Sequence, residues 1–344
     1  LIFTLALALI NIFFAANQPV AIYKWIKVLE FGLLGFYIYK TNVKLLDVSL
    51  PLSVGVLYSS LIAIAQFALQ HSIGGPLWFL GERTFMADTP GIAKIGYCGR
   101  IIDYLTAYIV SGCPEVLRPY ATFPHPNVLG GFLAITLPMV LYVYLFEKNK
   151  AWKKMFLGST YVIGGIALVL TYSRSAALAF GLGTLYVLAY VLRKKSQQIK
   201  HVILVCIIML FIIVTRGFVR GNAVRWTESV AVREQLNMSA FAMWKQHPWF
   251  GVGVGNFLVA LPQFLPSREI YFLQPVHNIY LLVLAETGIV GFVGLVWALW
   301  KLIQRSQWQL FFFFKDKGFG KLELSTVFTI ALFSFLMIGF FDHY

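Results

Sequence analysis

The stretch "QPVHNIYLLVLAETGIVGFVG" places a histidine directly before an apolar segment that is long enough to cross a membrane. His277 precedes this segment. A neutral histidine can take a proton from a hydroxyl group, and the positive N-terminal end of a helix attracts anions such as diphosphate. In its neutral form His277 is therefore a candidate base, with Asn278 and Tyr280 as candidate contacts of a bound ligand.

Glu286 lies within the same segment, where an ionisable group is costly and usually has a role. It follows His277 by nine residues, which on a straight helix is about 900° of rotation and about 13 Å of rise. The two side chains then lie on opposite faces and do not form a base and its orienting partner. We predict a structural bond from Glu286 to a neighbouring helix, and close helix packing at Gly288, Gly291 and Gly294.

Arg174 lies in "LTYSRSAAL", which leaves only a tight turn between two apolar segments. A guanidinium stays charged and its planar fork matches phosphate or carboxylate oxygens, so Arg174 is a candidate anion ligand. An arginine near a helix end also reaches lipid headgroups by snorkelling. The sequence leaves both interpretations open.

A second arginine lies in a predicted amphipathic helix over residues 229–246. Arg233 shares one face of this helix with Val230, Asn237, Phe241 and Trp244, because their spacings are three and four residues. An arginine on such a face is expected to meet an anion. The glycines of the following "HPWFGVGVGNF" predict a tight loop or a close approach to a ligand, and their spacing is not a nucleotide fingerprint.

The motif "YATFPHPNVLGG" precedes another apolar segment. Its two prolines confine the residues before them to extended geometry. Asn127 is a suitable helix cap, and the alternative is that His125 or Asn127 contacts the substrate.

The composition predicts an all-α polytopic membrane protein. Hydrophobic residues make up 59% of the chain, charged residues 12%, and the mean hydropathy is +0.76. A soluble domain is about half apolar and a quarter charged. Apolar runs of spanning length predict about nine transmembrane helices, near residues 1–16, 24–40, 48–70, 127–146, 156–172, 175–192, 202–215, 278–300 and 325–341.

The net charge of +14 is distributed as a topology signal. Basic residues exceed acidic ones in four alternate loops, as the positive-inside rule expects, namely residues 40–47, 147–154, 193–200 and 301–323. The two long loops, 71–126 and 216–277, are then extracytoplasmic parts of one transmembrane domain over residues 1–344. We predict membrane lipids as partners, and no nucleic acid.

Cys98 and Cys113 share the first long loop, where a disulfide is one interpretation and two free thiols the other. No group of residues has metal-ligand spacing and no nucleotide-binding loop occurs, so we predict neither a metal nor a nucleotide. Residues 1–16 lack the features of a cleavable signal peptide. We expect the natural chain to extend beyond both ends.

Four segments together resemble the O-antigen ligase/polymerase superfamily of bacterial membrane glycosyltransferases. They are "FPHPNVLGGF", "TYSRSAAL", "REQLNMSAFAMWKQHPWFGVGVGNF" and "HNIYLLVLAETGIVGF". The resemblance covers about residues 120–300. It implies a GT-C-like helical bundle in the bacterial inner membrane, with the active site facing the periplasm or the outside. The first long loop matches nothing in the family, and members usually have more spans.

The resemblance also implies a reaction. A glycan is transferred from undecaprenyl diphosphate to an acceptor hydroxyl, without metal or cofactor. Arg174 matches the arginine after the serine of the tight turn. Arg233 best matches the arginine of the large loop, with Arg225 as a competitor, and these arginines would hold the diphosphate. His277 matches the histidine that acts as general base.

The sequence leaves the acceptor open. Lipid A–core as acceptor would make the protein a ligase, which we favour. A second lipid-linked glycan would make it a polymerase, and a protein hydroxyl would make it an O-oligosaccharyltransferase. The alternative from another class is a transporter of an anion or of the lipid-linked glycan.

Overall fold

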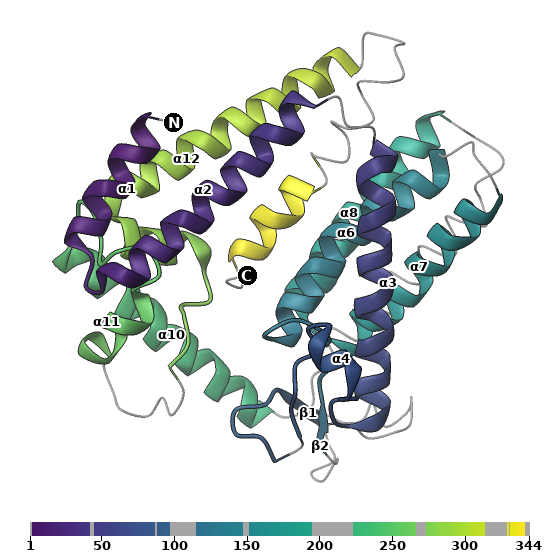
Figure 1. Cartoon of the computed structure of the whole chain (residues 1–344), viewed down its shortest axis with the longest axis horizontal. Coiled ribbons are helices and arrows are strands. Elements are labelled where there is room, and N and C mark those ends of the chain that lie inside the picture. The colour runs from purple at the N-terminus through teal and green to yellow at the C-terminus, as the bar shows by residue number, and fades with distance from the viewer. Residues whose placement is uncertain are drawn as a thin grey trace. The chain divides into compact units, whose positions relative to one another are not determined.

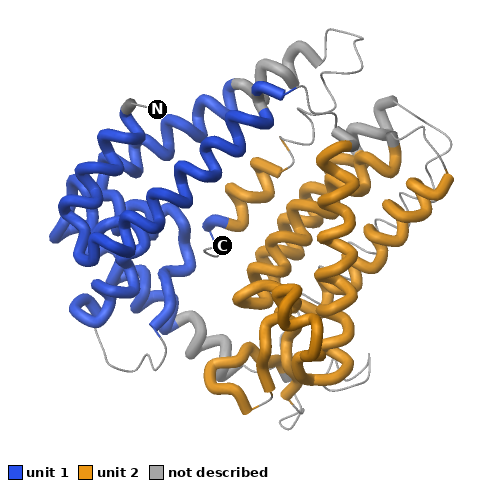
Figure 2. Tube along the Cα trace, viewed as in Figure 1, with its two compact units in different colours: residues 1–44, 225–317, 339–343 blue, residues 45–224, 318–338, 344 orange. Residues whose placement is uncertain are grey.

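The computed structural model describes residues 2–41, 45–86, 88–96, 115–146, 151–194, 223–265, 273–313, 329 and 331–340. In these ranges the chain is mostly helical, with one short antiparallel hairpin (Figure 1). This agrees with the predicted helical membrane class. The chain divides into two compact units (Figure 2). Unit 1 contains residues 1–44, 225–317 and 339–343, and unit 2 contains residues 45–224, 318–338 and 344.

Within the described residues, four helices are long and apolar enough to cross a membrane, namely Asp47–Leu69, Pro126–Leu145, Ala151–Leu170 and Ile279–Gln304. Shorter apolar helices cover Phe3–Phe14, Arg174–Leu188 and Ala331–Phe340. The span predicted over 202–215 lies outside the described residues. The total of nine spans therefore stays a prediction.

Unit 2 is built around helices α3 (Leu45–Leu69), α6 (Pro126–Phe146), α7 (Ala151–Leu170) and α8 (Arg174–Lys194). Helix α6 packs against the other three. Gly164 allows α7 to lie close to α6, because a Cβ at this position would stand 2.5 Å from a methyl group of Leu137. Gly130 allows a similar approach to the start of α8, where a Cβ would stand 3.0 Å from Ala176. Small residues are therefore what lets these apolar helices pack closely.

The described part of the first long loop folds onto the end of α3 through polar side chains. It contains α4 (Pro76–Phe79) and the hairpin of β1 (Lys94–Gly96) and β2 (Glu115–Leu117), in which Lys94 pairs with Leu117. The buried Gln66 of α3 donates to Glu82 Oε1 at 2.9 Å and accepts from the backbone N–H groups of Tyr120 and Ala121. The loop is thus tied to α3. Cys98 and Cys113 lie outside the described residues.

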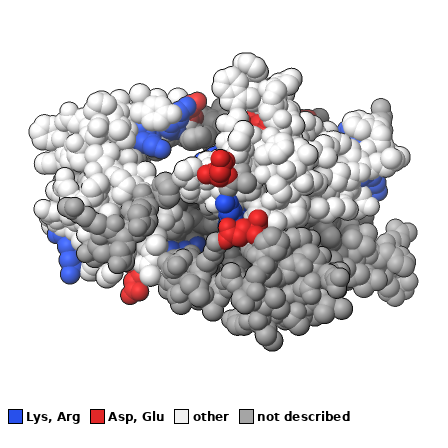
Figure 3. Space-filling model, turned by 90° about the horizontal axis from the view of Figure 1, so that it is seen from below, with Lys and Arg blue, Asp and Glu red and all other residues white. Residues whose placement is uncertain are grey.

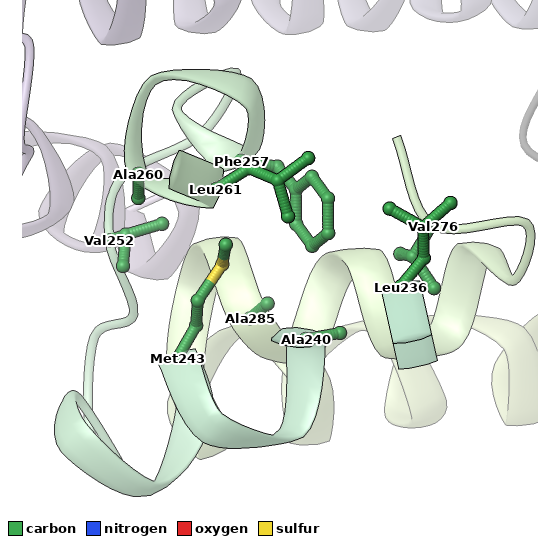
Figure 4. Packing of buried hydrophobic residues seen from close by; sticks show 9 residues of the cluster. All are labelled: Leu236, Ala240, Met243, Val252, Phe257, Ala260, Leu261, Val276 and Ala285. Atoms are coloured by element: carbon green, nitrogen blue, oxygen red, sulfur yellow. The ribbon is translucent and has the colours of Figure 1, made fainter. Parts of the chain in front are cut away.

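Unit 1 combines α1 (Ile2–Phe14), α2 (Gln18–Lys40), α10 (Ala223–Gln246), α11 (Phe257–Phe264) and α12 (Ile279–Phe313). Helix α2 begins where Asn17 caps Val20 N–H and Pro19 occupies the first turn. Helix α1 packs against α2 and α12. A core of apolar side chains joins α10, α11 and the start of α12 (Figure 4).

Helix α12 is interrupted, which the sequence did not predict. Gly288 has φ 64° and ψ −168°, and the helix continues on either side of it. Such a conformation is open to glycine and costly for other residues. The Gly288 Cα also lies against the Trp249 carbonyl, because an added Cβ would stand 2.3 Å from that oxygen. The helix predicted over residues 278–300 is therefore interrupted at Gly288, two residues after Glu286.

Candidate functional site

His277 lies just before α12 in a segment that is anchored by its neighbour. Val276 is fully buried in the core of unit 1, in the same cluster as Leu236 of α10 and Leu261 of α11 (Figure 4). His277 itself is half-buried, and its Nε2 lies 3.3 Å from Gln274 Oε1. The backbone at the predicted base is therefore held in the core, while its imidazole remains accessible.

Asn278 and Tyr280 have structural contacts in unit 1. Asn278 Oδ1 accepts from the N–H groups of Tyr280 and Leu281, both at 3.0 Å, so Asn278 caps α12. Its amide also donates to Phe340 O at 3.4 Å. The Tyr280 and Phe340 rings lie 4.5 Å apart between centroids. These contacts fix the start of α12, and contact with a substrate stays a prediction for both residues.

Arg233 lies on α10, and the side of α10 that packs in the protein core differs from the face that Arg233 shares with Phe241 and Trp244. The buried side chains are Leu236, Ser239, Ala240 and Met243. Phe241, on the predicted face, is 43% exposed, and Arg233 is half-buried. The two faces differ by one residue, or about 100°. The reason is that the aliphatic residues of α10 and not its aromatic ones pack against α11 and Val276.

The structure brings α10 and the His277 segment together within unit 1. Leu236 lies one turn after Arg233 and shares the core with Val276, the residue before His277. Arg225 lies eight residues before Arg233 on α10, which is about 12 Å along the helix axis. Its side chain is outside the described part of the structure. Along α10, Arg233 therefore lies nearer than Arg225 to the core that contains Val276, the neighbour of His277.

The glycine loop after α10 is tight, as one of the two interpretations predicted. Gly251, Gly253 and Gly255 all have positive φ, at 68°, 100° and 77°. The loop runs along α12, since Val252 N donates to Ala285 O and Gly253 N donates to Glu286 O, both at 3.0 Å. The close approach that these glycines allow is made to the protein's own backbone.

Glu286 has a structural role, and one of its bonds goes to a neighbouring helix, as predicted. It is 9% exposed, and its carboxylate accepts from Gly255 N at 2.8 Å and from Phe257 N at 3.1 Å. Phe257 is the first residue of α11, so the carboxylate stabilises the positive end of that helix. The bonds thus go to the glycine loop and to the N-terminus of the neighbouring helix α11.

Asn11 completes this arrangement and was missed by sequence analysis. Its amide donates to Phe250 O at 2.8 Å and to Glu286 O at 2.9 Å. Its Oδ1 accepts from Trp25 Nε1 and Val254 N, both at 2.9 Å. A single asparagine within the apolar α1 was the available signal, because a buried amide must find partners. Asn11 joins α1, α2, the glycine loop and α12.

We expect Glu286→Ala to lower the stability of the folded protein by about 2–5 kcal/mol, because two buried N–H groups lose their acceptor. The measurement is thermal unfolding of the detergent-solubilised protein. Glu30→Ala is the matched control, since Glu30 makes only an exposed ion pair with Lys27 at 2.8 Å. Equal unfolding temperatures for Glu286→Ala and the control would contradict the structural role.

In unit 2, Arg174 opens α8 directly after a turn of three residues. Tyr172 in this turn has φ 50°, which is rare for a residue other than glycine. Ser173 O accepts from Ala177 N at 3.0 Å, which closes the first turn of α8. Arg174 is half-buried. The predicted tight turn is present, and it sets the position from which the Arg174 side chain extends.

His125 and Asn127 lie at the start of α6, with roles that differ from the predicted cap. Helix α6 begins at Pro126, and His125 O accepts from Val128 N and Leu129 N. His125 Nδ1 accepts from Asn127 N at 3.1 Å, so the ring proton lies on Nε2. Asn127 is therefore inside the first turn and is not the cap. Its Oδ1 accepts from Arg118 Nη2 at 2.5 Å.

Arg118 is the residue of this region that sequence analysis missed. It is 3% exposed and lies in the long loop whose charges balance, so no charge pattern distinguished it. Unit 2 brings together Arg118, Asn127 and the turn before Arg174. Unit 1 brings together His277, Asn278, Tyr280 and the helix of Arg233. These are the two groups of candidate residues that the structure describes.

Charged side chains are sparse among the described residues on the face shown in Figure 3. On the face in Figure 3 most described residues are uncharged, and Lys, Arg, Asp and Glu lie in small separate groups. Among the described residues, no cluster of three or more His, Cys, Asp or Glu side chains could hold a metal ion. The prediction of a metal-free reaction continues to rest on the resemblance.

Comparison with known protein families places part of this chain beside a described family. Residues 159–296 match the family model described as O-antigen ligase. The comparison with curated proteins found no match. The matched segment contains Arg174, Arg225, Arg233 and His277, and it begins after His125 and Asn127. The resemblance stated from the four motifs is thereby confirmed over these residues.

Proposed function

Because residues 159–296 form a segment of the O-antigen ligase family, we propose that this protein is a membrane glycosyltransferase of that type. The donor is a glycan linked to undecaprenyl diphosphate, and the acceptor is a hydroxyl group on the outer face of the bacterial inner membrane. The match is the observation that carries the proposal. Four candidate spanning helices agree with a multi-pass protein.

In the proposed reaction, His277 removes the proton of the acceptor hydroxyl. The acceptor oxygen then forms a bond to the anomeric carbon of the glycan, and the bond from this carbon to the diphosphate oxygen breaks. Undecaprenyl diphosphate leaves with the bonding electron pair. The base activates the acceptor hydroxyl, and fixed positive charge stabilises the departing diphosphate. The buried Val276 supports the first role, because it anchors the backbone of the base.

The positive charge is assigned to Arg174 and Arg233, with Arg225 as the weaker candidate. Arg174 begins an apolar helix after a tight turn. Such a fixed origin suits a guanidinium group that binds two oxygens of the diphosphate. Arg233 extends from a helix that packs in the same core as Val276, one turn before the buried Leu236. The reaction needs no metal in this proposal, because the arginines offset the charge of the leaving group.

A transporter is the second candidate, and the break in α12 favours it. Discontinuous helices near the middle of the membrane form the binding sites of many transporters. In this chain the break at Gly288 is filled by the protein itself. The Trp249 and Phe250 backbone lies against Gly288, and the Glu286 carboxylate is bonded to the glycine loop and α11. This packing argues for the glycosyltransferase.

The test is product analysis with purified protein. Undecaprenyl-diphosphate glycan is supplied together with lipid A–core, a second lipid-linked glycan and an acceptor peptide, in the presence of EDTA. We expect transfer to one of the three, and its identity distinguishes ligase, polymerase and protein transferase. Folded protein that transfers glycan to none of them, with or without Mg²⁺, but moves the donor across liposome membranes would be a transporter. Transfer that requires Mg²⁺ would contradict the metal-free mechanism.

A further inference from the structure

Arg118, in the first long loop, is a buried charge of unit 2. Its Nε donates to Thr171 O at 2.7 Å, and its Nη2 donates to Asn127 Oδ1 at 2.5 Å. One guanidinium therefore bridges two elements that are far apart in sequence. Thr171 is the first residue of the turn between α7 and α8, and Asn127 is in the first turn of α6.

The backbone of Arg118 is itself held firmly. Its N–H donates to Ala93 O at 3.0 Å next to the β1–β2 hairpin, and Leu117 N donates to Gln70 Oε1 at 2.7 Å. Leu117 packs in a small core with Phe85 and Tyr120. Two residues further on, Gln66 of α3 bonds the N–H groups of Tyr120 and Ala121. Hydrogen bonds to α3 and its C-terminal end thus fix the position of the loop backbone at Arg118.

The turn that Arg118 contacts leads directly to Arg174. It has one conformationally costly residue, Tyr172, and the Thr171 hydroxyl donates to Leu168 O of α7 and accepts from Ser173 N. The Arg118 guanidinium and the Thr171 carbonyl are both buried. Other donors, such as water, therefore compete for Thr171 O only when Arg118 is removed. A costly backbone conformation persists where contacts from the surrounding structure hold it in place. The bond from Arg118 to Thr171 O is one of the contacts that hold this turn.

We propose that Arg118 is a positioning residue for Arg174, through which the first long loop sets the geometry of the diphosphate site. The inference rests on the proposed function, in which Arg174 binds the diphosphate. The physical basis is the planar fork of arginine, which bonds a carbonyl and an amide oxygen at once. A lysine keeps the charge but makes a point contact, and does not maintain this bridge.

The first measurement is independent of activity. Hydrogen exchange of the peptide containing residues 168–178 is followed in purified wild type, Arg118→Ala, Arg118→Lys and Lys94→Ala. We expect faster exchange in this peptide for both Arg118 variants. Lys94→Ala removes a basic residue from the same loop without a contact to the turn, and we expect it to exchange as the wild type does. Unchanged exchange in Arg118→Ala would overturn the proposal.

The second measurement is steady-state transfer. We expect Arg118→Ala and Arg118→Lys to raise KM for the lipid-linked donor by about 10- to 100-fold while KM for the acceptor stays unchanged. When an Arg118 variant is combined with Arg174→Lys, the free-energy effects on KM for the donor are expected to be less than additive. The reason is that both changes weaken the same contact, that of Arg174 with the diphosphate. Full restoration by lysine, or additive effects, would overturn the positioning role. A wild type without transfer would instead refute the proposed function, and hydrogen exchange would still test the bridge.

Discussion

Replacement of His277 by alanine is expected to lower kcat for glycan transfer by about 10²- to 10⁴-fold, the contribution of a general base. The protein should remain folded, because Val276 and the Asn278 cap, and not the imidazole, hold this segment. The measurement is single-turnover transfer from the lipid-linked donor. The unfolding temperature is measured in parallel.

His247→Ala is the matched control for this variant. His247 lies in the second long loop and is exposed, and its backbone N–H bonds to Met243 O. We expect wild-type transfer from this control. Wild-type transfer from His277→Ala would exclude His277 as the base, and a lower unfolding temperature would indicate that its contact with Gln274 is structural.

Arg174→Lys is expected to reduce kcat/KM for the lipid-linked donor by about 100-fold. Lysine retains the positive charge and the helix start, so the loss isolates the planar fork that binds two phosphate oxygens. The turn before Arg174 fixes the origin of the side chain, and a shorter point charge does not reach the same oxygens. The measurement is the dependence of transfer rate on donor concentration.

The control for this variant lies on the same helix. Arg193→Lys makes the same change at the other end of α8, and we expect no effect on transfer. If Arg174→Lys retains full activity, the arginine serves lipid headgroups by snorkelling, which is the alternative that the sequence left open. A loss of equal size in both variants would assign the effect to α8 as a whole.

The sequence by itself determined the features that arise within a few residues. Apolar runs predicted membrane-spanning helices because length and hydropathy are local properties, and the described residues contain four helices that are long and apolar enough to cross a membrane. The "TYSRS" motif predicted the tight turn before Arg174, and the glycines of "GVGVG" predicted a tight loop because positive φ is a property of single residues. The family resemblance came from the same kind of signal and is confirmed for residues 159–296.

Only the tertiary structure decided the contacts between distant segments. Asn11 and Glu286 are 275 residues apart, and Arg118 and Thr171 are 53 apart, so no local pattern predicts these bonds. The periodicity of α10 gave a plausible face, but burial followed the aliphatic side chains that fit against α11. Gly288 interrupts α12 because the Trp249 backbone occupies the space beside it. The physical reason is the same in each case: packing and buried polar groups are satisfied by partners that only the fold brings close.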